Sequence, residues 1–120
     1  PADCKRRAGQ GYGMEFPRVI PNSDGAGLVD ALGPDAEGAP PLGSRVWLYN
    51  AQRGRPFGTA AEFTCVPADC LAPLPDGVPF EAGACLGIPA MTAHRCLFAD
   101  GPVRGLRVLV SGGGGAVGNY

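Results

Sequence analysis

Several features that would narrow the function at once are missing from this sequence. It has no apolar run near the roughly 20 residues that cross a bilayer. It shows no charged-then-apolar leader, although a segment before Pro1 would hide one. The longest basic run is Lys5-Arg6-Arg7 and the net charge is -1, so the clustered basic face of a nucleic-acid-binding protein is absent. These absences favour a small-molecule partner over a membrane or a nucleic acid.

Paired cysteines are also missing. The chain has 5 cysteines, an odd number, and no Cys-x-x-Cys motif. Structural zinc lobes and disulfide frameworks use tighter, paired spacings. We therefore predict reduced and mostly buried thiols in a cytoplasmic protein.

Glycine and proline, by contrast, are abundant, with 20 and 13 residues. Residues 1–25 are turn-rich and hold no predicted core element. Strand-like runs follow at 26–32, 45–49 and 61–67, separated by Gly/Pro loops. Short strands at this spacing predict a compact β-barrel or sandwich rather than a low-complexity segment.

The pattern changes after residue 76. Pro79 suits the first position of a helix, and Pro89 is expected to separate two short helices because it cannot donate an interior bond. The second helix is predicted near 89–99 and ends at Asp100-Gly101. An apolar strand at 106–111 then enters a run of glycines. We predict a domain transition at 76–90, with a β-rich domain at 1–87 and the opening βα unit of an α/β domain at 88–120.

Residues 111–118 read Ser-Gly-Gly-Gly-Gly-Ala-Val-Gly, which satisfies Gly-x-Gly-x-x-Gly directly after the apolar strand. Side chains are excluded there because the strand must turn tightly and the backbone must approach phosphate oxygens. Free N–H groups at a helix N-terminus then attract the anion. A flexible linker is the alternative. We predict that the cofactor's pyrophosphate is bound by Gly112, Gly115, Ala116, Val117 and Gly118.

Several motifs together, in order and spacing, resemble one family over nearly the whole chain. The chain resembles the zinc-independent quinone oxidoreductase (zeta-crystallin-like) branch of the medium-chain dehydrogenase/reductase superfamily, as an internal fragment. The matching segments are Pro-Ala-Asp at 1–3, Pro-Asn-Ser-Asp-Gly-Ala-Gly at 21–27, Gly-Ser-Arg-Val at 43–46, Gly-Thr-Ala-Ala-Glu-Phe at 58–63, Leu-Pro-Asp-Gly-Val at 74–78 and Gly-Ile-Pro-Ala-Met-Thr-Ala at 87–93.

The resemblance implies α/β architecture: a β-rich GroES-like substrate domain followed by a Rossmann domain, truncated here. It also implies NADPH, hydride transfer to a quinone, and a homodimer. Reduction of an enoyl thioester or another α,β-unsaturated carbonyl is an alternative activity. A residue about 20 positions past the turn selects NADH or NADPH, and that position lies beyond Tyr120.

Zinc-dependent relatives carry Gly-His-Glu where this chain reads Asn22-Ser23-Asp24, so a histidine ligand is absent. The position of a later cysteine ligand is occupied by Ile88. A catalytic zinc needs about three protein ligands. We therefore predict no metal site, and catalysis that rests on hydride positioning and hydrogen bonds to the developing oxyanion.

Four residues are site candidates, of which Thr92 and Asp3 are candidates by resemblance. Thr92 matches a family threonine that lies near the nicotinamide. The alternative role of its hydroxyl is a hydrogen bond to the backbone of its own helix. Asp24 either lines the cleft or braces a turn. Asp3 matches a residue near the active site. Tyr49 either faces substrate or is a half-buried strand tyrosine.

Two alternatives from other classes stay open. The protein could be non-catalytic, as a crystallin-like structural protein or an RNA binder, although the missing basic stripe opposes RNA. The 120-residue piece alone is predicted to be inactive and aggregation-prone, because the 106–110 strand has no parallel neighbours to pair with.

Overall fold

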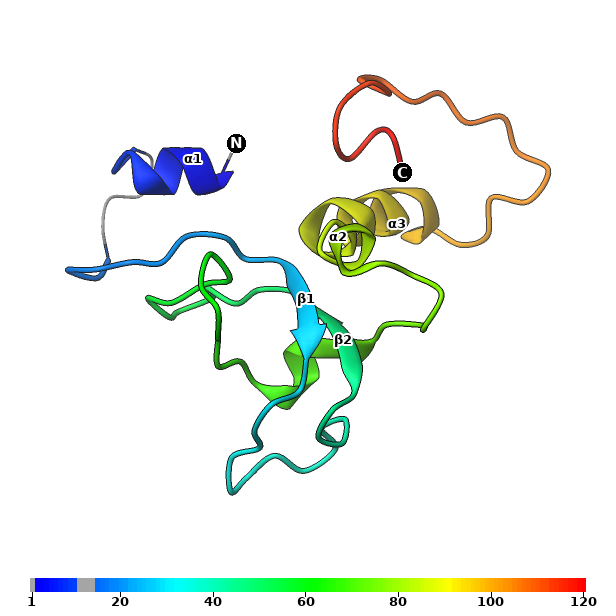
Figure 1. The fold of residues 1–120 in the computed structure, drawn as a ribbon. Helices are drawn as coiled ribbons and strands as arrows, with labels where there is room; N and C mark the ends of the chain where they lie inside the picture. The colour runs from blue at the N-terminus through cyan, green and yellow to red at the C-terminus, as the bar shows by residue number, and fades with distance from the viewer. Residues whose placement is uncertain (1, 11–14) are drawn as a thin grey trace.

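A small antiparallel sheet forms the centre of the structure, a computed structural model that describes residues 2–10 and 15–120. The sheet order is β1-β2-β3, from Gly25–Leu28, Arg45–Leu48 and Leu71–Pro73. Leu48 of the central strand lies opposite Gly25 on one side and Leu71 on the other. Figure 1 shows β1 and β2 side by side in the middle of the molecule.

β2 forms within the predicted 45–49 strand, and its side chains alternate between buried and half-buried. Val46 and Leu48 are 3% and 7% exposed, whereas Arg45 and Trp47 are half-buried. This period of two is that of a strand with one buried face. The apolar residues buried among those described are few: Val29, Val46, Leu48, Ala51, Leu74 and Ala93.

Helices lie before, within and after the strands in the chain. They are α1 (Ala2–Arg7), the single turn η1 (Ala68–Cys70), α2 (Phe80–Gly83), the turn η2 (Leu86–Ala90) and α3 (Met91–Phe98). The predicted pair of short helices near Pro89 is present, but the backbone kink lies at Gly87. Proline is tolerated in a first helical turn, where its missing N–H costs nothing. Gly101, at φ 117°, follows the end of α3 as predicted.

Arg45 joins the sheet to the start of α2. Its guanidinium donates to the carbonyl of Val78 and lies 4.1 Å from the centre of the Phe80 ring. The Asp76 carboxylate lies 3.8 Å from its Nε, but that side chain is fully exposed and contributes little. α2 packs against β1 and β2. In Figure 1 it lies with α3 at one end of the sheet.

Three local predictions are wrong. The 61–67 segment is not a strand: Phe63 is 73% exposed, and the strand that pairs with β2 is Leu71–Pro73 instead. β1 ends at Leu28 rather than at residue 32. The turn-rich region 1–25 contains a helix, α1, which buries none of its residues. Alternation alone does not make a strand, because a strand also needs a partner edge.

The 106–111 segment is not a strand either. Leu106, Val108, Leu109 and Val110 are 66%, 50%, 97% and 52% exposed. The radius of gyration is 16.1 Å, against roughly 14 Å for a compact domain of this length. Figure 1 shows the reason: the chain leaves α3 as a long loop before it arches back over the helices. The predicted strand has no neighbour among the described elements.

The thiols are free, as predicted, but the expectation that most are buried is wrong. Cys70 is half-buried, and the exposed cysteines are Cys4, Cys65, Cys85 and Cys96. They lie on α1, on α3 or in the segments between the helices and strands. In the described part of the chain, no helix is long and apolar enough to cross a membrane.

Candidate functional site

Asp24 lies directly before β1 and joins three parts of the molecule. Its Oδ2 accepts a hydrogen bond of 2.8 Å from the backbone N–H of Ile88. Its own carbonyl accepts a hydrogen bond from the hydroxyl of Thr59. The carboxylate therefore connects the sheet to the start of the 88–98 helical segment, 64 residues further along the chain.

The environment of this carboxyl raises its pKa overall. Burial raises the pKa of Asp24 above its ordinary value of 3.8, the hydrogen bond from Ile88 lowers it, and the negative charge of Asp3 raises it. Desolvation disfavours a charge, whereas a donated hydrogen bond favours it. The second oxygen, Oδ1, is buried and has no hydrogen-bond partner. Asp3 and Asp24, both predicted near the active site, are thus electrostatic neighbours.

Gly87 allows the carboxylate to come this close. A Cβ added at Gly87 would overlap Cγ and Oδ1 of Asp24 and would lie 2.8 Å from its Cβ. Any side chain at this position would therefore displace Asp24 from the Ile88 N–H. The absence of a side chain at the kink is a steric requirement of the site.

Thr92 continues the same chain of hydrogen bonds. Its Oγ1 donates to the carbonyl of Ile88 at 2.6 Å, one helical turn back. Ile88 therefore accepts from Thr92 and donates to Asp24. This is the helix-backbone bond considered as the alternative for Thr92. Since the donated proton occupies only one side of the oxygen, Oγ1 keeps acceptor capacity.

Tyr49 is placed differently. It is half-buried, its ring lies 6.0 Å from that of Trp47, and its hydroxyl donates to the carbonyl of Asp69 at 2.9 Å. The β1–β2 register puts Tyr49 at the same end of the sheet as Asp24, since Gly25 pairs with Leu48. Its hydroxyl, however, is used to hold η1, as expected for a half-buried strand tyrosine.

The glycine turn folds back on itself. The N–H of Gly115 donates to the carbonyl of Gly112 at 2.8 Å, and Asn119 donates to the carbonyl of Gly115 at 3.0 Å. A Cβ at Gly118 would overlap the Gly112 carbonyl oxygen and would lie 2.8 Å from its carbon. Close approach to another backbone group of the turn is therefore the reason for glycine here, whereas the motif predicts close approach to phosphate oxygens.

Tyr120 ties this turn to the helices. Its hydroxyl donates to the carbonyl of Cys85 at 2.7 Å, two residues before Gly87. Figure 1 shows the C-terminal end returning to α2 and α3. Asp24, Thr92 and the end of the glycine turn thus meet around residues 85–92. Asp3 is linked to them only through its charge, and the Tyr49 hydroxyl binds η1 instead.

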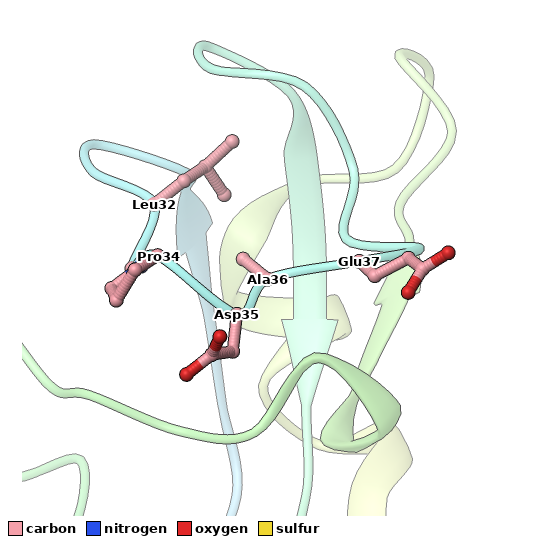
Figure 2. Close-up of a pocket in the computed structure, with 6 residues that line it drawn as sticks. Leu32, Pro34, Asp35, Ala36 and Glu37 are labelled. Atoms are coloured by element: carbon pink, nitrogen blue, oxygen red, sulfur yellow. The ribbon is translucent and has the colours of Figure 1, made fainter.

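The hollow in Figure 2 is a different feature. It measures about 440 Å³ and is lined by residues 32–37, a single loop that is exposed apart from Ala36. The predicted site residues are not part of its lining. We therefore place the candidate site at residues 85–92 and not in this loop.

Side chains that could bind a metal are not clustered in the described part of the chain. Among residues 2–10 and 15–120, no three His, Cys, Asp or Glu side chains lie close enough to hold a metal ion. Ile88, which is compared with a zinc-ligand cysteine, donates its backbone N–H to Asp24, the residue directly after Ser23, which is compared with the histidine ligand.

Comparison with known proteins identifies the family. The profile of the alcohol dehydrogenase GroES-like domain matches residues 1–76. The chain belongs to this family. The predicted GroES-like domain and the predicted fold class are thereby confirmed.

The relatives are oxidoreductases of greater length. A quinone oxidoreductase from Mus musculus is 41% identical over 82% of this chain and 28% of its own length. A 2-methylene-furan-3-one reductase from Solanum lycopersicum is 32% identical over 99% of this chain and 32% of its own. A mycobacterial protein solved with NADPH superposes with a TM-score of 0.75, at 35% identity, over 98% of this chain and 35% of its own. The chain thus spans about a third of these proteins.

Two contributors to the site were not predicted from the sequence. Gly87 was noted only as the start of a family motif, and Ile88 only as a missing zinc ligand. Both act through the backbone, which leaves little trace in residue type. The sequence signal that could have indicated this contact was the glycine followed by Ile-Pro at the start of a helix.

Proposed function

We propose that this chain is a segment of a zinc-independent, NADPH-dependent oxidoreductase that transfers hydride to a quinone. The observation that carries the proposal is the hydrogen-bonded chain from Asp24 through Ile88 to Thr92, beside the place where Tyr120 anchors the glycine turn. The name of the mouse relative supports the quinone, and the NADPH complex of the mycobacterial protein supports the cofactor.

The proposed roles of the two parts of the chain follow the predicted domains. We propose that residues 1–87 belong to the substrate domain and 88–120 to the opening of the nucleotide-binding domain. The kink at Gly87 supports this boundary, since two helical segments meet there. Asp24 then contacts the nucleotide-binding part from the substrate part.

Each part of the site has a role in this proposal. Gly112, Gly115, Ala116, Val117 and Gly118 hold the pyrophosphate; the steric exclusion of a side chain at Gly118 is the feature that fits a phosphate turn. Thr92 Oγ1, whose proton is used by Ile88, accepts a hydrogen bond from the nicotinamide carboxamide. The cofactor supplies the hydride, and the chain orients it.

Zinc independence has a residue-level support. The positions compared with two zinc ligands are Ser23 and Ile88, of which the second lacks a metal-binding side chain. Carbonyl polarisation must then come from hydrogen-bond donors rather than from a Lewis acid. We propose hydride positioning as the main catalytic contribution.

A second candidate reaction is reduction of an α,β-unsaturated carbonyl. The tomato relative supports it, because the compound in its name is itself such a ketone. Both reactions deliver hydride to a conjugated acceptor, so the same site serves either one.

The test is an assay of the complete protein. NADPH consumption is followed with para-benzoquinone and, separately, with methyl vinyl ketone, each before and after treatment with a zinc chelator. We expect faster turnover of the quinone and no effect of the chelator. Faster turnover of the ketone would favour the second reaction, and loss of activity with the chelator would refute zinc independence. Bound NADPH without turnover of either acceptor would point to a non-catalytic role.

We also propose a homodimeric, cytoplasmic protein. The dimer follows from the family resemblance, and the free thiols suit a reducing compartment. Light scattering of the complete protein measures the first, and microscopy of a tagged protein measures the second. A salt-sensitive, NADPH-displaced gel shift with RNA would instead support the RNA-binding alternative.

A further inference from the structure

The first turn of a helix carries N–H groups without intrahelical acceptors. In this chain one of them, the N–H of Ile88, is satisfied from outside the helix, by the carboxylate of Asp24 at the edge of the sheet. A side-chain oxygen usually performs this role from the residue before the helix. Here the residue before Ile88 is Gly87, whose non-helical backbone forms the kink inside η2 and which has no side chain to offer. A negative charge at a helix N-terminus is also favoured by the helix dipole.

The second half of the connection is the carbonyl of Ile88. The Thr92 hydroxyl donates to it at 2.6 Å, which fixes the direction of the Oγ1 proton. Pro89 follows Ile88 and restricts the backbone of the preceding residue. The position of Oγ1 therefore depends on the Ile88 backbone, which is fixed at its N–H by Asp24.

The steric fit shows that the connection is tight. Asp24 lies so close to Gly87 that no Cβ fits between them, and Thr59 fixes the backbone carbonyl of Asp24. Oδ1 has no hydrogen-bond partner among the described atoms. The carboxylate thus has one directional contact, with Ile88, and little room to move away from it.

We propose that Asp24 is a positioning residue for hydride transfer, which acts through the Ile88 backbone to orient Thr92 toward the nicotinamide. This proposal rests on the proposed NADPH-dependent function. It differs from a catalytic role, because Asp24 needs no contact with substrate or cofactor. It also differs from a purely structural role, because its effect must pass through Thr92.

The experiment is a double-mutant cycle in the complete protein. The variants are Asp24→Ala, Thr92→Val and the pair, with Asp24→Asn as the conservative replacement and Asp35→Asn, in the exposed 32–37 loop, as the matched control. We expect Asp24→Ala to lower kcat about tenfold or more, as small misplacements do. We expect Asp24→Asn to recover much of that loss, since its amide oxygen also accepts from Ile88. Asp35→Asn should behave as the parent.

The energetic coupling between Asp24 and Thr92 distinguishes a positioning role from a purely structural one. If Asp24 acts through Thr92, Asp24→Ala should cost little more in the Thr92→Val background, so that the two losses do not add. Additive losses would overturn the proposal, as would a parental kcat and NADPH KM in Asp24→Ala. If Asp24→Ala does not fold, Asp24→Asn is the deciding variant. A folded Asp24→Asn protein with kcat reduced about tenfold would show that the negative charge, and not the hydrogen bond to Ile88, is required. That result would also overturn the proposal.

A second measurement separates this proposal from the proposed function. Titration with NADPH needs no turnover and is repeated with each variant. If the parent binds NADPH but reduces neither acceptor, the proposed function fails, and the coupling between Asp24 and Thr92 is still read from the dissociation constants. If Asp24→Ala leaves NADPH affinity unchanged while Thr92→Val weakens it, the positioning role is refuted.

Discussion

Replacement of Gly87 by alanine is the sharpest perturbation that the structure offers. The new Cβ would overlap Cγ and Oδ1 of Asp24 and lie 2.8 Å from its Cβ. Gly87 is buried, and the carboxylate is held by the Ile88 N–H at 2.8 Å. Asp24 is a short side chain next to β1, so it can relieve the overlap only by leaving Ile88.

The magnitude follows from these two effects. Overpacking of a well-packed position costs about 1–3 kcal/mol. The lost hydrogen bond has a charged acceptor and contributes about 1.5–3 kcal/mol, and since Asp24 is half-buried the lower end applies. We therefore expect Gly87→Ala to destabilise the protein by about 3 kcal/mol, or roughly a hundredfold in the folding equilibrium.

The assay is urea denaturation of the complete protein, followed by circular dichroism. The matched control is Gly77→Ala, where an added Cβ meets nothing within 4 Å. A third variant adds Asp24→Ala to Gly87→Ala. It removes two of the three atoms in conflict but keeps Cβ of residue 24 at 2.8 Å, so the added Cβ should cost less in this background than in the parent. Equal midpoints for Gly87→Ala and Gly77→Ala would show that the close approach of Asp24 to the kink is wrong.

Three further predictions concern other contacts. Arg45→Met should destabilise the protein by about 1–2 kcal/mol in thermal melts, because a carbonyl bond and the stack on an aromatic ring are lost; an unchanged Tm would refute this. Burial and a nearby acid raise the pKa of Asp24 above 3.8, so its contribution to stability is fully present below that pH and declines as pH rises through the folded-state pKa. Thermal melts from acid to neutral pH should therefore show the Tm of Asp24→Asn rising relative to that of the parent as pH rises. A pH-independent difference in Tm would contradict this. Gly118→Ala should abolish NADPH binding in a titration, since its Cβ would overlap a backbone carbonyl of the turn, whereas Gly114→Ala, with open space around it, should bind normally.

Local signals predicted the elements that depend on local physics. The β2 segment is rich in β-formers and forms a strand, in which Val46 and Leu48 are the buried residues. The end of α3 was predicted from Gly101, whose φ of 117° suits glycine after a helix. In both cases the deciding interaction lies within a few residues of the signal.

Pairing partners decided the segments that were predicted wrongly. The 61–67 run alternates well enough for a strand, but β2 pairs with Leu71–Pro73, a segment that contains a proline and shows weaker alternation. Strand formation depends on which edge is available, and that is settled by tertiary packing rather than by propensity. The same holds for 106–110, whose apolar side chains are mostly exposed because no described strand lies beside them.

In the site, too, local contacts could be predicted from the sequence and long-range contacts could not. The glycine turn could be recognised from the sequence because its constraint is internal: Gly118 has to pass the carbonyl of Gly112, six positions earlier. The contact between Asp24 and Ile88 joins residues separated by 64 positions and uses a backbone N–H, which any residue but proline supplies. Only the family resemblance brought these two segments into one argument, because Asp24 follows Ser23, the counterpart of a histidine ligand, and Ile88 is the counterpart of a cysteine ligand. The structure gives that comparison a physical meaning: the residue beside one of these positions accepts a hydrogen bond from the backbone of the other.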